Sequence, residues 1–438
     1  FKTLRNALKI EDIRKKLIFT FLMLVVVRFG SQLPIPGANR DYFQAWFAQQ
    51  TGDAFNFFDA FTGGSFTSMS LFALGITPYI TSSIIVQLLT IAIPKLEEMQ
   101  KDGEDGRKKI AEYTRYLTVG LALFESCAMA VGLGGKGLLL EDHRNIWGYL
   151  TVVAAMTAGS ALLMWIGERI TDNGVGNGIS IVLLINIVSG TPQDMMTLYE
   201  RFMAGRSVAV ATVSGIIVLA IIVAIVVFVL VLNDAERRIP VQYSKKMQGR
   251  RMIGGQSTYI PLKVNTANVI PVIFASSIMS MPVMIAQFFH VDYSTIGGKI
   301  LLALSSSNWF KPEAPAYSIG MLVYIVLVVL FAYFYTSITF NPLEVANNMK
   351  KSGGFIPGIR PGKPTSEYLT KILNYIIFIG AVGLVIVAII PIFFEGAFNA
   401  SISFGGTSLI IIVGVIIETL KQIESRMLVR NYKGFLND

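Results

Sequence analysis

Charged side chains are scarce in this 438-residue sequence, in which Asp, Glu, Lys and Arg together make up 15% of the residues. A soluble domain carries about 25%. Hydrophobic residues make up 53% of the chain, and the mean hydropathy is +0.58. Long apolar runs replace the alternation of strands and helices that is typical of soluble nucleotide-binding enzymes. The composition therefore indicates a polytopic membrane protein.

Cysteine and histidine are almost absent. Cys127 is the only cysteine, which excludes an internal disulfide, and the only histidines are His143 and His290. A His/Cys metal site needs more ligands than these. The sequence also lacks the GxxxxGK[ST] motif that cradles nucleotide phosphates. We therefore expect no metal, no cofactor and no enzymatic activity.

Ten apolar segments are candidates to cross a bilayer, whose core of ~30 Å needs ~20 helical residues. The predicted fold is thus an all-α polytopic membrane protein. The fifth segment is short and lies between Gly178 and Gly190, so we expect it deep in the bundle. The predicted spans are 17–33, 71–93, 117–133, 147–166, 178–190, 208–232, 268–289, 317–340, 372–394 and 406–420.

Lysine and arginine are unevenly distributed over this layout. With the N-terminus in the cytoplasm, 29 of the 37 fall in inside segments and seven in outside segments, and Arg28 lies within a span. Such a bias in short loops sets the orientation of a membrane protein. Because the number of spans is even, both termini are expected in the cytoplasm. The net charge of +9 is mostly a topology signal.

Five spans in each half is an odd number, so two related halves, 1–190 and 191–438, have opposite orientations. Inverted repeats of this kind place a functional pathway at the interface between the halves. The second span of each half carries a proline, Pro78 or Pro271, followed shortly by Ser-Ser-Ile. Coincidence in helices rich in Ile and Ser explains this match equally well.

An aromatic segment, 55–66, lies between the first two spans and is interrupted by Gly63 and Gly64. It is too short to cross the membrane, and irregular backbone exposed to lipid leaves amides unsatisfied at several kcal/mol each. The segment must therefore lie within protein or line a wet cavity. One interpretation is a re-entrant plug, and the other is an aromatic belt at the membrane interface.

Two predicted cytoplasmic loops, 233–267 and 341–371, are long and basic. Exposed arginines suit phosphate or carboxylate partners. From charge alone, RNA phosphate and an acidic protein surface are equally good partners, and the alternative is that the charges only fix topology. The candidate docking residues are Arg237, Arg238, Lys245, Lys246, Arg250, Arg251, Lys350, Lys351 and Arg360.

Few charged residues lie within spans. A charge at mid-membrane costs roughly 2.5–3.5 kcal/mol on insertion scales and is a functional candidate. Arg28 and Glu418 lie near predicted span ends, where long side chains reach the interface. Glu125 is more central, so it should face a neighbouring helix or an aqueous path.

Several distinctive stretches occur in order and at the predicted spans: FALGITPYITSSIIVQLL (72–89), GNGISI (176–181), Arg237-Arg238 with YSKK (243–246), QSTYIPLKVN (256–265), VIPVIFASSI (269–278), NPLEVA (341–346), FIPGIRPG (355–362) and FGGTSL (404–409). Through them the chain resembles, along nearly its whole length, the bacterial SecY family of protein-translocation channels. The resemblance implies two inverted, pseudo-symmetric five-helix halves in a clamshell, with an hourglass channel between them.

The resemblance also implies a division of labour among residues. An apolar ring would narrow the channel, dewet it and deform around a passing chain; without the resemblance, its members would be ordinary core residues. The ring positions are Ile76, Ile80, Leu183, Ile187, Ile273 and Ile411. The plug maps onto about 57–70, with Phe58, Phe61, Gly63 and Gly64, and the lateral gate onto Thr81, Glu125, Ser277 and Met281.

The implied function is a passive pore that translocates unfolded secretory proteins across the bacterial plasma membrane and inserts membrane proteins laterally. Signal sequences and membrane lipid meet at the gate. The two basic loops imply docking of the motor ATPase SecA, for which Arg360 is the matching arginine, and of the ribosome with its rRNA. The small subunits SecE and SecG are the implied membrane partners.

Two other classes of membrane protein compete with this interpretation. A secondary transporter would need converging polar groups at the midplane, where this chain carries mostly Ile, Val and Leu with Glu125 nearly alone. An intramembrane hydrolase needs Ser with His or Lys, paired Asp, or a metal triad. Neither histidine falls within the middle of a span.

Overall fold

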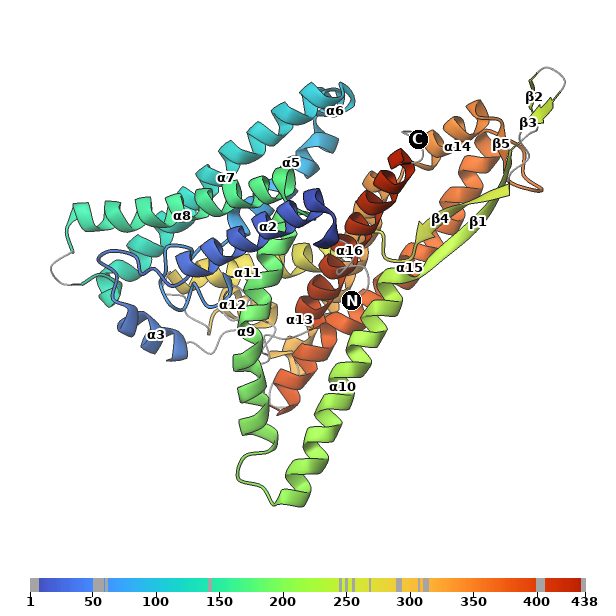
Figure 1. Cartoon of the computed structure of the whole chain (residues 1–438). Coiled ribbons are helices and arrows are strands. Elements are labelled where there is room, and N and C mark those ends of the chain that lie inside the picture. Colours follow the sequence, from blue (N-terminus) through green and yellow to red (C-terminus); the bar gives the residue numbers. More distant parts are fainter. Residues whose placement is uncertain are drawn as a thin grey trace. The chain divides into compact units, whose positions relative to one another are not determined.

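The computed structural model describes residues 8–49, 59, 62–140, 144–243, 246–248, 251–253, 257–267, 269–288, 294–305, 308–309, 315–398 and 406–434 (Figure 1). These residues belong to two compact units. Unit 1 comprises residues 1–196, 282–301 and 415–438, and unit 2 comprises 197–281 and 302–414. The predicted division into sequence halves at residue 190 stays a prediction.

A helix is present at each of the ten predicted spans. The ten are α2 (Glu11–Gly30), α5 (Thr77–Ala92), α7 (Glu104–Leu133), α8 (Ile146–Asn173), α9 (Gly178–Phe202), α10 (Val208–Asp234), α11 (Ile270–Phe288), α13 (Ile319–Thr339), α15 (Lys363–Phe398) and α16 (Gly406–Gly434). Shorter helices are α3 (Arg40–Gln49), α6 (Pro94–Lys101), η1 (Gly134–Leu138), α12 (Ile296–Leu304), η4 (Pro315–Ser318) and α14 (Pro342–Lys351).

Length and hydropathy together identify fewer certain spans than ten. Among the described residues, five helices are long and apolar enough to cross a membrane, or six if the pair α5 and α6, bent by 107°, counts as one. Helices α2, α7 and α16 carry charged turns that lower their mean hydropathy, although each contains an apolar stretch at its predicted span.

Unit 1 is built on α5, α7 and α8, with α2 packed against α8. In Figure 1, α7 and α8 run side by side. The largest cluster of buried side chains joins these helices to the segments that precede α5 and follow α7. It contains Ile35, Phe43, Phe66, Met69, Ala73, Leu74, Ala122, Met129, Ala130, Leu138, Leu139, Val152 and Met156.

Several helix boundaries differ from the predicted spans; α7, for example, begins at Glu104 rather than at residue 117. Two of the differences involve glycine or proline. The second span was expected from residue 71, but α5 begins at Thr77, after Gly75 takes a left-handed φ of +59° and just before Pro78 in the first helical turn. The fifth was expected to end at Gly190, but α9 continues through Pro192 to Phe202. Pro192 has no amide hydrogen, so the carbonyl of Val188 lacks the helical donor that any other residue at 192 would supply, and the helix nevertheless continues.

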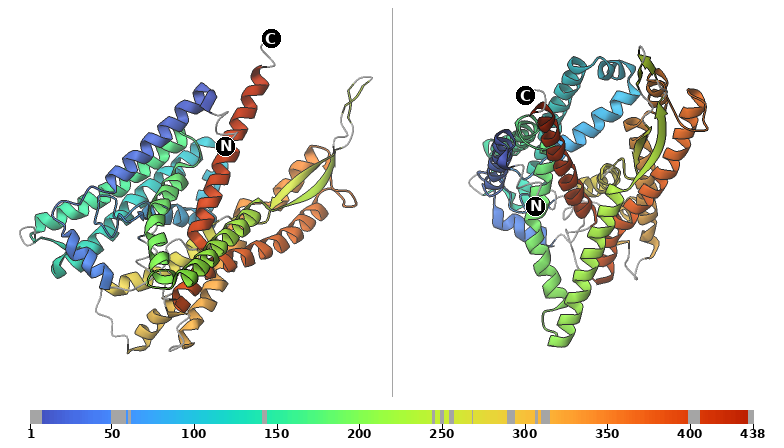
Figure 2. Two further views of the ribbon diagram at one scale, coloured as in Figure 1. Left: turned by 60° about the horizontal axis from the view of Figure 1, so that its bottom comes forward. Right: turned by 45° about the vertical axis from the view of Figure 1, so that its right-hand side comes forward.

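Unit 2 folds the two basic loops into one module, which the sequence analysis treated as separate loops. Strand β1 (Glu236–Tyr243) pairs antiparallel with β4 (Ser257–Lys263) and, at its other edge, with β5 (Gly354–Phe355). A second hairpin joins β2 (Lys246–Gln248) to β3 (Arg251–Ile253). We call residues 233–267 and 341–371 the basic module; its strands follow α10 in Figures 1 and 2.

A hydrophobic cluster holds the basic module together. Ile239 and Val241 alternate with exposed residues along β1, and both pack with Leu262 of β4. Met349 of α14 and Leu369 of α15 complete the cluster from the helical side. Because one set of buried side chains comes from both loops, the two segments fold as one body.

Candidate plug site and basic module

The backbone of residues 62–76 is irregular and lies within unit 1. Its amides are hydrogen-bonded locally; the amide of Ser70 donates to the carbonyl of Ser65 at 3.0 Å. The segment also pairs with the chain that follows α2, where the amide of Leu71 donates to the carbonyl of Leu33 at 2.8 Å. Thr62, Ser65 and Phe66 are almost fully buried. The segment therefore satisfies the requirement that irregular backbone at membrane depth be covered by protein.

Gly63 is the point at which this segment meets the helices. Its carbonyl accepts a hydrogen bond from Arg28 Nη1 of α2 at 3.3 Å and from Ser189 Oγ of α9 at 3.4 Å. A Cβ at Gly63 would lie 2.8 Å from the carbonyl oxygen of Asn186 and from Ser189 Oγ, and φ is +65°. Only glycine combines this left-handed conformation with so close an approach.

Arg28 thus has a contact that the sequence did not reveal. Its position near the end of a span predicts a side chain that reaches the membrane interface. In the structure its guanidinium is half-buried and donates to Gly63. Sequence patterns give no signal for such a contact, because the acceptor is a backbone carbonyl 35 residues away.

Residues 62–76 also pack against a cluster of buried hydrophobic side chains. Phe66 packs edge-on against Phe43 of α3, with ring centroids 5.3 Å apart and an interplanar angle of 80°. Met69 and Leu74 belong to the same cluster. The carbonyl of Gly75 accepts a hydrogen bond from Ser160 of α8 at 3.2 Å, so the entry to α5 is also fixed. Phe58 and Phe61, predicted as plug residues, lie outside the described residues.

The predicted ring positions are divided between the two units. Ile76, Ile80, Leu183 and Ile187 lie in unit 1, and Ile273 and Ile411 lie in unit 2. Ile76 immediately precedes α5 rather than lying inside it. Ile187 is buried and follows Asn186, whose carbonyl faces Gly63. The predicted plug segment therefore contacts the turn of α9 that carries a predicted ring residue, and the convergence of the six ring residues stays a prediction.

The predicted gate residues are likewise divided. Thr81 and Glu125 lie in unit 1, whereas Ser277 and Met281 lie in unit 2. Oε2 of Glu125 is buried, and no described residue forms a hydrogen bond with it. A buried carboxyl oxygen without a donor is costly. Beside it on α7, Ser126 Oγ lies 3.0 Å from Thr157 Oγ1 of α8.

The predicted docking residues occupy different environments in the basic module. Arg238 donates through Nε to Oε1 of Glu236 at 2.7 Å and lies over the ring of Tyr259, with Cζ 4.9 Å from the centroid. The hydrogen bond to Glu236 raises the pKa of Arg238 above its usual value. Arg237, also exposed, forms no ion pair with any described residue.

The remaining predicted docking residues lie in residues 341–371 and in the hairpin of β2 and β3. Lys350 and Lys351 occupy the last turn of α14, where they also complement the helix dipole. Arg360 is exposed in the turn before α15. Lys246 and Arg251 lie on β2 and β3, and Lys245 and Arg250 fall outside the described residues.

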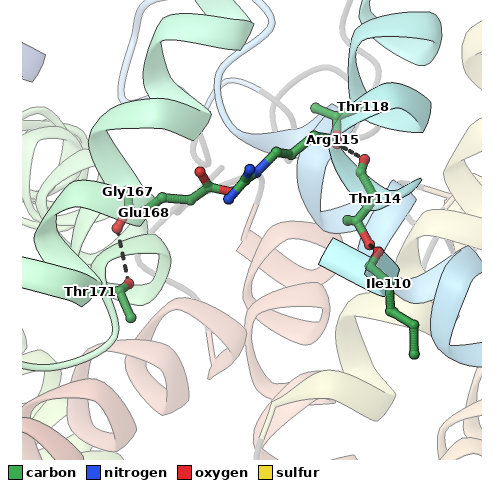
Figure 3. A network of polar contacts seen from close by, with 7 residues as sticks. All are labelled: Ile110, Thr114, Arg115, Thr118, Gly167, Glu168 and Thr171. Carbon is green, nitrogen blue, oxygen red and sulfur yellow. Dashed lines mark hydrogen bonds and ion pairs between the residues drawn. The ribbon is translucent and has the colours of Figure 1, made fainter. Parts of the chain in front are cut away.

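An ion pair between two helices was also missed by the sequence analysis. Arg115 of α7 donates through Nε to Oε1 of Glu168 of α8 at 2.8 Å (Figure 3). Thr171, one turn further along α8, donates to the carbonyl of Gly167 and accepts from the amide of Gly178. Both charges adjoin predicted span ends, which is the only sequence signal for the pair.

Within the described part of the chain, no group of three or more His, Cys, Asp or Glu side chains could hold a metal ion. The main features of the described residues are a buried irregular segment, hydrogen-bonded at Gly63, and a folded basic surface.

Comparison with known proteins assigns the family. The SecY family model matches residues 70–420. The protein translocase subunit SecY of Halalkalibacterium halodurans is 43% identical over 441 residues and covers 100% of both chains. The chain belongs to the SecY family. The SecY subunit of Streptomyces galbus is 46% identical over 445 residues, covering 98% of each chain.

Solved structures show that this SecY-family chain shares the fold of protein-conducting channels. A structure described as that of a protein conducting channel matches with a TM-score of 0.62 and 18% identity, covering 94% of this chain and 92% of that one. Sec61 in the canine ribosome-channel complex from the endoplasmic reticulum matches with a TM-score of 0.59 and 17% identity, with the same coverage. The predicted family and the predicted fold class are confirmed.

Proposed function

We propose that this chain is a passive protein-conducting channel of the bacterial plasma membrane. It translocates unfolded secretory proteins and releases membrane proteins sideways into lipid. The observation that carries the proposal is the position of residues 62–76. This irregular, buried segment contacts α9 through Gly63, at the helical turn that includes Asn186 and Ile187. Membership of the SecY family supports it.

The contacts at Gly63 suit a plug that must be released. Hydrogen bonds of 3.3 Å from a nitrogen donor and 3.4 Å from a hydroxyl are longer than the usual ranges, so each holds the segment weakly. A signal sequence that buries apolar side chains at the gate gains ~25 cal/mol per Å². That gain favours the open state by differential binding and outweighs a few weak contacts.

The basic module is the proposed docking surface for the partners that supply direction. SecA would bind through Arg360 and the neighbouring lysines, and the ribosome through the same exposed cations, which suit rRNA phosphates. SecE and SecG are the proposed small membrane subunits. In this scheme both chain termini lie in the cytoplasm, on the side of the basic module.

Site-specific photocrosslinking tests the channel function. A photoreactive residue is placed at Ile80 or Ile187, and vesicles holding the protein with SecE and SecG receive SecA, ATP and a secretory precursor stalled midway. The control position is Leu150 of α8, whose side chain is 58% exposed. We expect precursor adducts at Ile80 and Ile187 that disappear without ATP, and lipid adducts alone at Leu150. Lipid adducts at all three positions would reject the proposed path.

A further inference from the structure

The turn that carries Arg360 is anchored at both ends. On one side, β5 pairs Phe355 with Gln242 of β1, and Ile356 is buried in the cluster of the basic module. On the other side, α15 begins at Lys363. Between these anchors Gly358 and Gly362 take left-handed φ values of +82° and +105°, so the chain reverses within a few residues. Arg360 lies at the exposed tip of this turn.

Thr365 ties the tip directly to α15. Its side chain is completely buried, at 0% exposure, and its Oγ1 donates to the carbonyl of Arg360 at 2.9 Å. The amide of Thr365 also donates to the carbonyl of Gly362 at 3.1 Å, as does that of Ser366 at 3.2 Å. One buried residue therefore fixes two carbonyls of the turn through two different donors.

The burial of Thr365 belongs to the same packing as the strands. Leu369 follows it by one helical turn and is also at 0% exposure, within the cluster that contains Ile356. Residues four apart lie on one face of a helix. The packing of this cluster thus fixes the position of the Thr365 hydroxyl. The hydrogen bond from that hydroxyl in turn fixes the backbone of Arg360 relative to the cluster.

We propose that Thr365 is the positioning residue for Arg360 and holds the arginine at a fixed place for the motor ATPase. This proposal rests on the docking function given above for Arg360. A long flexible side chain loses less freedom on binding when its backbone is already fixed. A loosened turn should therefore weaken engagement of the motor while leaving the maximal transport rate unchanged.

Thr370 provides a matched control on the same helix. Its hydroxyl donates to the carbonyl of Ser366 at 2.9 Å, within α15 itself, and its side chain is exposed. Thr370→Val therefore makes the same chemical change as Thr365→Val without touching the turn. Thr365→Ser keeps the donor and should rescue, and Thr365→Ala is a second variant that removes it.

The first measurement reports the turn itself and does not depend on any partner. In a Cys127→Ser background, a spin label at Arg360→Cys is read by electron paramagnetic resonance in vesicles. We expect Thr365→Val and Thr365→Ala to increase the mobility of the label, and Thr365→Ser and Thr370→Val to leave it unchanged. Unchanged mobility in the Val and Ala variants would overturn the proposal.

The second measurement reports coupling to purified SecA. Translocation of a secretory precursor into vesicles is followed against SecA concentration, with Arg360 intact. A hydrogen bond worth about 1 kcal/mol corresponds to roughly a fivefold change, so we expect Thr365→Val to raise the half-maximal SecA concentration roughly fivefold at an unchanged maximal rate. A fall in maximal rate alone, or no change beside a more mobile label, would reject the positioning role.

The same experiment separates the two proposals. Arg360→Ala with normal dependence on SecA would refute docking through Arg360, whereas the label mobility would still decide whether Thr365 fixes the turn. Defects in both Arg360→Ala and Thr365→Val, with rescue by Thr365→Ser, would support both.

Discussion

Arg115 of α7 and Glu168 of α8, 53 residues apart in sequence, form a hydrogen-bonded ion pair of 2.8 Å (Figure 3). The side chain of Arg115 is 48% exposed and that of Glu168 is 23% exposed. The pair joins the helix that carries Glu125 to its most extensive helical neighbour in unit 1. It therefore bears on how freely α7 moves.

We expect a coupling free energy of about 0.5–1 kcal/mol between Arg115 and Glu168, because solvent screens a partly exposed pair. Thermal unfolding in detergent of Arg115→Ala, Glu168→Ala and the double variant gives this value as a double-mutant cycle. The pair Lys15–Glu11 within α2 is the control, since both side chains are more than half exposed and join no second helix. Equal coupling in the two cycles would contradict a special role for the interhelical pair.

Gly63→Ala should open the resting channel. The new Cβ would lie 2.8 Å from the carbonyl oxygen of Asn186, and φ of +65° adds a cost of about 1–2 kcal/mol. Gly64→Ala is the control, because φ is +79° there but nothing lies within 4 Å of its Cβ. Ion leak through vesicles without precursor should rise much more for Gly63→Ala, and equal leak would show that the seat of Gly63 is unimportant.

Arg28→Met should also weaken the attachment of Gly63, through the loss of a hydrogen-bond donor on α2. It removes the donor to the carbonyl of Gly63 and keeps a long apolar side chain, so packing is largely preserved. We expect a leak smaller than that of Gly63→Ala, since a single long hydrogen bond is worth about 1 kcal/mol. Ser189→Ala should matter less, because Ser189 Oγ makes its shorter contact, 2.6 Å, with the carbonyl of Asn186. The order of the three leak rates checks the assignment.

Arg237 and Arg238 should contribute unequally to partner binding. Arg238 is already paired with Glu236, whereas Arg237 has no ion pair among the described residues. Arg237→Gln should therefore reduce the affinity for ribosomes, measured by co-sedimentation, more than Arg238→Gln does. Raising the salt concentration should shrink the difference between the two variants, because screening weakens exposed charges. A larger loss for Arg238→Gln would contradict this reasoning.

The helices were predictable because each needs only a local apolar run. The helix boundaries were not predictable where the backbone conformation of a single residue decides them. Gly75 delays the start of α5, and α9 continues through Gly190 and Pro192, two residue types that were expected to end it. Neither effect is visible in the mean hydropathy of a window.

The sequence predicted which residues form the candidate plug segment, but it did not predict the contacts that they make. Gly63 was identified from its place in an aromatic, glycine-broken segment, but its donors Arg28 and Ser189 come from helices distant in sequence. The sheet of the basic module was not predicted, because charged residues dominate its strands and only a few positions are buried. The alternation of Ile239 and Val241 along β1 was the available signal.

The pairing of β1 with β5 also limits how such chains diverge. Two stretches separated by about a hundred residues share one ladder of hydrogen bonds and one set of buried side chains. A substitution at Ile239 therefore changes the packing around Met349 and Ile356, which belong to the other stretch. A chimera that takes only one of these stretches from a distant relative should therefore have mismatched packing in the interior of the basic module.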